Sequence, residues 1–180
     1  MSKLGNWEVK VSVSGMPQRV ATAVSALSEQ LIGAEYTPIA YLGSQVVNGT
    51  NHAVLAQQLI TTGKDTKNLV LLIFNEKGVS DCTLVNIERV VEGGGEFGGT
   101  QIDVSTAVPE EAQKAFDETL AGFVGSRVEI IAYIGSKITK GTEYKFACTV
   151  TPVVPDAKPS VCIVTVNSMT KKLSFENIFA

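Results

Sequence analysis

The residues with the most reactive side chains in this chain are three cysteines and a single histidine. Cys82, Cys148 and Cys162 include no Cys-x-x-Cys spacing, and His52 has no other histidine near it, so neither a disulfide framework nor a zinc site is predicted. A Cys/His nucleophilic pair would need His52 beside a cysteine from a predicted strand, where free thiols are usually buried and inert. Cys148 and Cys162 fall in neighbouring predicted strands and can face each other. We expect no enzyme, no cofactor and no metal.

The composition of the 180 residues narrows the functional classes further. Hydrophobic residues make up 44% of the chain and charged residues 18%, which predicts a packed core. A net charge of −3 argues against nucleic-acid binding and against a basic membrane surface. The apolar runs are too short to span a bilayer, and Glu8 and Lys10 interrupt the N-terminal region before a leader segment forms. We therefore expect an intracellular, cytoplasmic protein, or a mature form whose leader has been removed.

The chain contains an internal duplication. The segment Ile39–Ser44 (IAYLGS) recurs as Ile131–Ser136 (IAYIGS), at an offset of 131 − 39 = 92 residues. Gly49-Thr50 matches Gly141-Thr142 at the same offset. A repeat of this length predicts two small domains with separate cores. We expect a first domain over residues 1–92, a glycine-rich linker over 93–99, whose spacing matches no phosphate-binding loop, and a second domain over 100–180.

Each copy has the same predicted order of elements. Alternating apolar residues from Trp7 to Val13 predict a strand, and an apolar stripe after Pro17 predicts a helix that ends at Gly33. Four β-rich segments follow in each copy. We expect these strands near residues 37–47, 50–61, 67–76 and 82–91, and again near 128–138, 143–153, 159–168 and 172–179. One strand, one helix and four strands predict an antiparallel sheet around the helix, of the α+β class.

The strongest local signal is Asn48-Gly49, which lies between two of these β-rich segments. An Asn-Gly pair favours a two-residue type I′ turn, because both residues tolerate a positive φ. The sequence therefore predicts a tight hairpin with its tip at Asn48-Gly49.

The octet at this tip, Ser44–Asn51 (SQVVNGTN), resembles the first inhibitory hairpin of the cystatins, and most closely that of the stefins. The family pattern Gln-x-Val-x-Gly is matched by Gln45, Val47 and Gly49. Gly15-Met16-Pro17 resembles the glycine trunk of stefins, and Thr83–Asn86 resembles their last strand. The resemblance implies two tandem cystatin-like domains, each a curved antiparallel sheet wrapped on one helix.

The resemblance also implies a function, which is reversible inhibition of papain-like cysteine proteases by a wedge of chain segments that fills the active-site cleft. The implied contact residues are Gly15, Gln45, Val46, Val47, Asn48 and Gly49. In the second copy Lys137 and Thr139 replace the glutamine and the valine, and only Gly141 is retained. One protease per chain is therefore expected.

A second interpretation belongs to another class. The hairpin can be architecture alone, and the chain a non-inhibitory module that binds or assembles with a protein partner through its sheets. Fourteen residues precede Gly15 and form a predicted strand. If this strand pairs beside the first hairpin and covers its tip, the module interpretation gains support.

Overall fold

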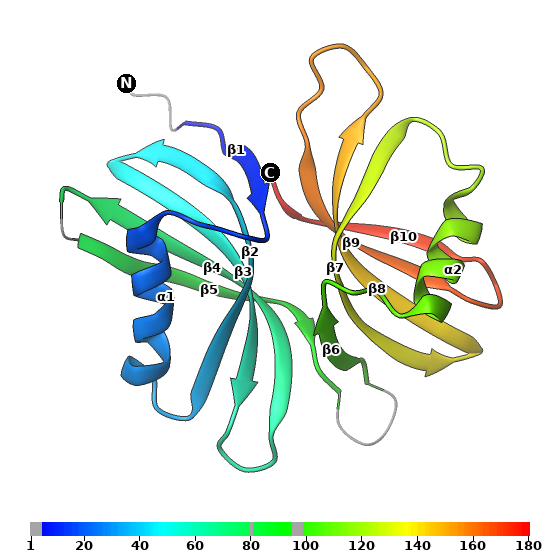
Figure 1. Cartoon of the computed structure of the whole chain (residues 1–180), viewed down its shortest axis with the longest axis horizontal. Helices are drawn as coiled ribbons and strands as arrows, with labels where there is room; N and C mark the ends of the chain where they lie inside the picture. The colour runs from blue at the N-terminus through cyan, green and yellow to red at the C-terminus, as the bar shows by residue number, and fades with distance from the viewer. Residues whose placement is uncertain (1–4, 80, 95–98) are drawn as a thin grey trace. The chain divides into compact units, whose positions relative to one another are not determined.

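A computed structural model describes residues 5–79, 81–94 and 99–180 of the chain, which forms two compact units, Met1–Glu92 and Gly93–Ala180. Among the described residues, the first unit holds one antiparallel sheet in the order β1-β2-β3-β4-β5 and the helix α1 (Figure 1). Its elements are β1 (Glu8–Ser12), α1 (Gln18–Gln30), β2 (Ala34–Val47), β3 (Gly49–Ile60), β4 (Thr66–Lys77) and β5 (Asp81–Glu92).

The second unit repeats this order of elements. Its described residues form an antiparallel sheet in the order β10-β9-β8-β7-β6 together with the helix α2 (Figure 1). The elements are β6 (Gln101–Ser105), α2 (Glu110–Leu120), β7 (Ser126–Thr139), β8 (Gly141–Pro152), β9 (Ser160–Asn167) and β10 (Leu173–Phe179). The predicted order of one strand, one helix and four strands is confirmed in both units, and strand ends differ from the predicted ranges by at most three residues.

The helices begin where the sequence predicts. Pro17 and Pro109 are the residues immediately before α1 and α2, and their φ angles of −51° and −56° suit the start of a helix. From α1, Val20, Val24 and Leu27 are buried against the sheet. The apolar spacing of 4 and 3 residues therefore gives the buried face that it predicts.

The expected fold class, α+β with each sheet wrapped on one helix as in the cystatins, is wrong. Strands hold 58% of the residues and helices only 14%, so the protein is mostly β, with two five-stranded antiparallel sheets in the part that the structure describes. The physical reason lies in the burial of the central strands. Residues 52–56 of β3 and 68–72 of β4 are buried without interruption. Because neighbouring strand residues point to opposite faces, side chains on both faces of these strands are buried, and those of Val54, Ala56, Val70 and Leu72 form the cluster that packs with α1.

The repeated hexapeptide has a structural reason in each unit. A Cβ atom at Gly43 would overlap the backbone carbonyl of Glu8 in β1, and one at Gly135 would overlap the carbonyl of Gln101 in β6. The ladder between β2 and β3 is irregular at Tyr41/Gly43, and that between β7 and β8 at the equivalent point. Glycine at these positions therefore lets the first strand of each unit lie against the sheet.

The predicted linker falls partly outside the described residues, since 95–98 are not among them. Its flanks are ordered: Gly93 forms an isolated bridge with Thr100, and the Gly94 amide donates to the Thr100 carbonyl at 2.8 Å. Within the described residues, neither helix has the length and apolar character that crossing a bilayer requires.

Candidate functional site

The predicted hairpin forms, with a different turn at its tip. Strands β2 and β3 pair from Ala34↔Ile60 to Val47↔Gly49, which leaves Asn48 alone at the tip. Gly49 has φ +95°, whereas Asn48 is not among the residues with positive φ. A type I′ turn needs positive φ at both central residues, so the predicted turn type is wrong although the position of the hairpin is confirmed.

Gly49 is held by the neighbouring strand as well as by the turn. A Cβ atom there would overlap the carbonyl oxygen of Glu76 and would lie 2.9 Å from Cγ of Lys77. These two residues end β4. The glycine therefore brings the β2–β3 tip against the end of β4, and its presence has a packing reason that is independent of any partner.

A series of hydrogen bonds between side-chain amides holds the hairpin in place. Nε2 of Gln45 donates to the Gly5 carbonyl at 2.8 Å, and Oε1 of the same residue accepts from Nδ2 of Asn51 at 3.2 Å. Asn75 Nδ2 donates to Asn51 Oδ1 at 2.8 Å, and it lies 3.5 Å from the Asn48 carbonyl at the tip. These bonds connect the N-terminal segment, β2, β3 and β4 in one network. Gln45 thus holds the N-terminal segment against the hairpin, and its side-chain amide already has hydrogen-bond partners within the first unit.

Three chain segments meet at this end of the first sheet. The Gly5 amide donates to the Val46 carbonyl at 3.1 Å, and Gly49 lies against the end of β4, from which the β4–β5 turn continues. Val46 is 71% exposed and Val79, in the β4–β5 turn, is 84% exposed. We call this surface the hairpin end: Gly5, Gln45–Gly49 and Lys77–Val79. The hairpin end exposes the apolar side chains of Val46 and Val79, while its backbone is held by hydrogen bonds.

Gly15 does not belong to the hairpin end. β1 runs antiparallel to β2, with Glu8 opposite Ser44 and Ser12 opposite Tyr41, so the chain moves away from the tip as it approaches Gly15. Gly15 is exposed and lines a shallow depression with residues 38–40. The glycine beside the hairpin is Gly5, which the sequence reasoning missed. The pairing of β1 with β2 is the signal that identifies it.

The N-terminal strand pairs beside the hairpin, which is one of the two conditions of the module interpretation. Its contact with Val46 runs through the backbone of Gly5, on the edge of β2, and the Val46 side chain stays exposed. Residues 1–4 lie outside the described part of the chain. Within the described residues, the first strand therefore occupies the edge of the hairpin and leaves its tip open.

A second polar network lies behind the β4–β5 turn. The hydroxyl of Tyr41 and Nδ1 of His52 are 2.9 Å apart, and Nε2 of His52 lies 2.9 Å from Oε2 of Glu76. Arg19, from α1, donates to Oε1 of Glu76 at 2.7 Å and to the Gly78 carbonyl at 2.6 Å. A neutral imidazole with its proton on Nε2 satisfies both of its contacts. Burial raises the pKa of the Tyr41 hydroxyl, so this oxygen keeps its proton at neutral pH. The network ties the turn to the helix.

In the described part of the second unit, most of the side chains that build these two networks are replaced. At the 92-residue offset, Lys137 and Glu143 take the places of Gln45 and Asn51, and Tyr144 takes the place of His52. Asn167 is retained, and its Nδ2 donates to the Lys140 carbonyl at 3.1 Å. Asn167 Nδ2 also lies 3.3 Å from the Thr139 hydroxyl, and the Thr142 amide donates to the Ser168 hydroxyl at 3.0 Å, so other side chains hold the hairpin of the second unit. It too carries an exposed apolar residue at its tip, Ile138, which is 85% exposed.

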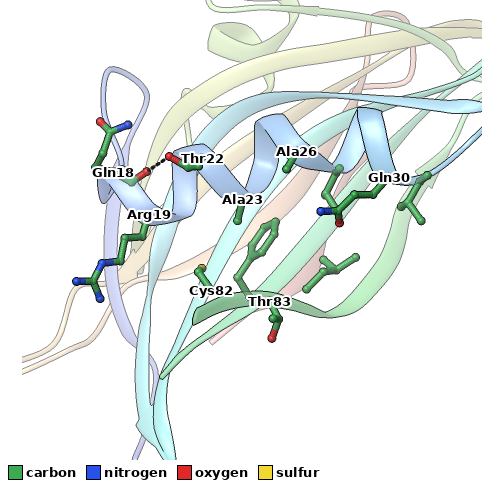
Figure 2. A pocket seen from close by; sticks show the side chains of 12 residues that line it. Gln18, Arg19, Thr22, Ala23, Ala26, Gln30, Cys82 and Thr83 are labelled. Atoms are coloured by element: carbon green, nitrogen blue, oxygen red, sulfur yellow. Dashed lines mark hydrogen bonds between the residues drawn. The ribbon is translucent and has the colours of Figure 1, made fainter. Parts of the chain in front are cut away.

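A groove in the first unit lies between α1 and the edge strand β5 (Figure 2). Its volume is about 510 Å³, and its floor is apolar around Phe74 and Leu84. Cys82 lines it, and burial raises the pKa of this thiol, so the sulfur is protonated at neutral pH and is a poor nucleophile. Neither a carboxylate nor an imidazole is among its lining residues, so the described part of the groove holds no acid–base pair.

No cluster of three or more potential metal ligands occurs among the residues that the structure describes. No protein-family model matches the chain, and no curated protein matches it either. The stefin resemblance of the hairpin therefore stays a prediction.

Proposed function

We propose that the hairpin end of the first unit binds reversibly in the active-site cleft of papain-like cysteine proteases and thereby inhibits them. The observation that supports this most is the convergence of three turns and segments at one end of the sheet. Gly5, the β2–β3 tip and the β4–β5 turn are adjacent, and they present Val46 and Val79 to solvent. A narrow protrusion with exposed apolar side chains suits a deep cleft.

The rigidity of the hairpin end favours binding. The amide chain from Gly5 to Asn75 and the bonds from Arg19 to Glu76 and Gly78 hold both turns in place before any partner arrives. Ordering of loops is a large cost of association, so a preorganised edge loses less conformational entropy on binding. One protease per chain is expected because Lys137 and Thr139 replace the glutamine and the valine of the pattern in the second unit.

Val46 is the residue through which the proposal is best tested. Burial of a valine side chain is worth about 1.5–3 kcal/mol, which corresponds to roughly 10- to 150-fold in affinity. Val46→Asp removes this gain and adds the desolvation of a carboxylate. Because the Val46 side chain is exposed and its hydrogen bond to Gly5 uses the backbone, the substitution leaves the framework intact.

The experiment is a tight-binding titration of papain and of a cathepsin with the wild-type chain, Val46→Asp and Ile138→Asp. Ile138 is the equivalent position of the second unit and is the matched control. We expect inhibition with a stoichiometry of one, an inhibition constant at least about 30-fold weaker for Val46→Asp, and no change for Ile138→Asp. Equal inhibition by all three chains contradicts the proposal, as does a weakening confined to Ile138→Asp.

The alternative is a non-inhibitory module that binds a protein partner. The edge strand β5 favours it, because in the described part of the sheet this strand is mostly exposed and its outer edge can pair with a partner strand. If the folded wild-type chain inhibits neither protease, this alternative replaces the inhibitor function. Dependence of partner capture on Val46 then shows whether the hairpin end is its binding surface.

A further inference from the structure

Two cysteines of the second unit face each other directly across its sheet. Strands β8 and β9 pair without a register shift, and Cys148 is opposite Cys162 in this ladder. Both belong to the cluster of buried side chains on the α2 face of the sheet, so both thiols point to the same side. In the first unit the equivalent pair is Ala56 opposite Val70, which makes the facing thiols a feature of the second unit.

The ladder sets the distance between the two residues. In an antiparallel pair, opposite residues alternate between hydrogen-bonded and non-hydrogen-bonded positions. The Ser168 amide donates to the carbonyl of its opposite residue Thr142 at 2.9 Å, so that pair is of the hydrogen-bonded class. Cys148 lies an even number of residues further along β8, which puts Cys148 and Cys162 in the same class, with Cα atoms about 5.5 Å apart. Disulfides form at Cα separations of about 4.4–6.8 Å.

We propose that Cys148 and Cys162 are a dithiol modification site that forms a cross-strand disulfide by exchange with a low-molecular-weight disulfide such as oxidised glutathione. One cysteine thiolate attacks a sulfur of the glutathione disulfide, forms a mixed disulfide and releases one glutathione thiolate. The other cysteine thiolate then attacks the protein sulfur of the mixed disulfide and releases the second glutathione. The two protein thiols lose two protons and two electrons, and one glutathione disulfide becomes two glutathione molecules.

The surroundings of the pair decide how the exchange proceeds. Burial raises the pKa of both thiols, so the closed unit holds them protonated and unreactive. The Ser160 hydroxyl lies 3.8 Å from Sγ of Cys162 and favours its thiolate. Cys162 also lies in β9, which is covered on one side by the edge strand β10. Transient opening of β10 therefore exposes Cys162 first, and we expect the mixed disulfide to form there.

The test equilibrates the wild-type chain, and in parallel its Cys82→Ser variant, with oxidised glutathione in mild urea that permits local opening. Mass spectrometry of the intact chain should show a loss of about 2 Da, reversed by dithiothreitol, and peptide mapping should place the cross-link between Cys148 and Cys162. The oxidised chain should melt at least about 5 °C higher, because the bond closes a short loop in the unfolded state. The Cys162→Ser variant should show no cross-link.

Three outcomes overturn the proposal. One is an unchanged mass at equilibrium under these conditions. A second is a stable glutathione adduct that never proceeds to an internal cross-link. A third is a cross-link in the wild-type chain that includes Cys82, which belongs to the other unit. The wild-type measurement needs no substitution in the core, so failure of a variant to fold does not prevent a decision.

Discussion

Replacement of Gly49 by alanine tests whether the first hairpin is held by its packing against β4. The new methyl group would overlap the Glu76 carbonyl and approach Lys77, and the residue would have to keep a φ of +95°. A non-glycine residue in such a conformation costs about 1–3 kcal/mol, and forcing an extra carbon into a packed site costs about 1–3 kcal/mol more. We expect Gly49→Ala to lower the free energy of unfolding of the first unit by about 3 kcal/mol.

Gly78 provides a matched control in the same unit. Its φ is +63°, and a Cβ atom there meets no atom within 4 Å. Gly78→Ala therefore carries only the backbone cost, about 1 kcal/mol. The difference of about 2 kcal/mol corresponds to a melting temperature roughly 10 °C lower for Gly49→Ala than for Gly78→Ala in a unit of this size.

The assay is urea unfolding followed by the fluorescence of Trp7, which is the sole tryptophan and lies in the first unit. Equal destabilisation by the two alanines would refute the reasoning, since it would mean that β4 yields to the added carbon. A wild-type midpoint for Gly49→Ala would refute it more strongly. The same result bears on inhibition assays: loss of inhibition on substitution of Gly49 is ambiguous, whereas Val46 separates binding from folding.

Three further predictions concern side chains that fasten each unit. Arg19→Ala removes both bonds between α1 and the β4–β5 turn, and we expect faster hydrogen exchange at Gly78 with a stability loss of about 1 kcal/mol or less, since the pair is partly exposed. Phe146→Ala empties a fully buried position of the second core, and chemical denaturation should report a loss of about 3–5 kcal/mol. The Lys171 ammonium lies 2.6 Å from Glu118 and lowers the pKa of that carboxyl, so Lys171→Ala should raise the Glu118 pKa in an NMR titration. In the wild-type chain this ion pair stabilises the folded state at pH values above the pKa of the unfolded chain. The stabilisation is lost as the pH falls through the lowered pKa of the folded state. An unchanged titration would show that the ion pair does not persist in solution.

Local sequence signals predicted the elements well, because each of them acts within a few residues. Pro17 fixes the start of a helix, the stripe from Val20 to Leu27 fixes its buried face, and Asn48-Gly49 breaks a β-rich run at one point. The predicted fold class was wrong because these local signals do not show how much of the core comes from the strands and how much from the helix. The uninterrupted burial of β3 and β4, which makes the sheets the larger part of the core, depends on what packs on both faces of a strand.

The sequence predicted the candidate site only for residues that lie close together along the chain. Gln45, Val47 and Gly49 lie together because a hairpin brings them together. Gly15 was misplaced because its distance from the tip depends on how β1 pairs with β2, which involves a register shift after Val9. Register of a short edge strand is weakly encoded in its own residues. The network of Arg19, His52 and Glu76 draws on three separate elements, and no spacing in the sequence signals it.

The glycines under the first strand of each unit bear on how the two halves have diverged. At equivalent positions of the two units Gln45 and Lys137 differ, whereas Gly43 and Gly135 are retained. Gly43 and Gly135 met a backbone carbonyl, which cannot adjust, and any copy that gained a methyl group there would have lost its first strand. The best-preserved segment of the repeat, residues 39–44 and 131–136, is therefore explained by a requirement of folding. A search for remote relatives with this hexapeptide would find proteins of similar architecture before proteins of similar activity.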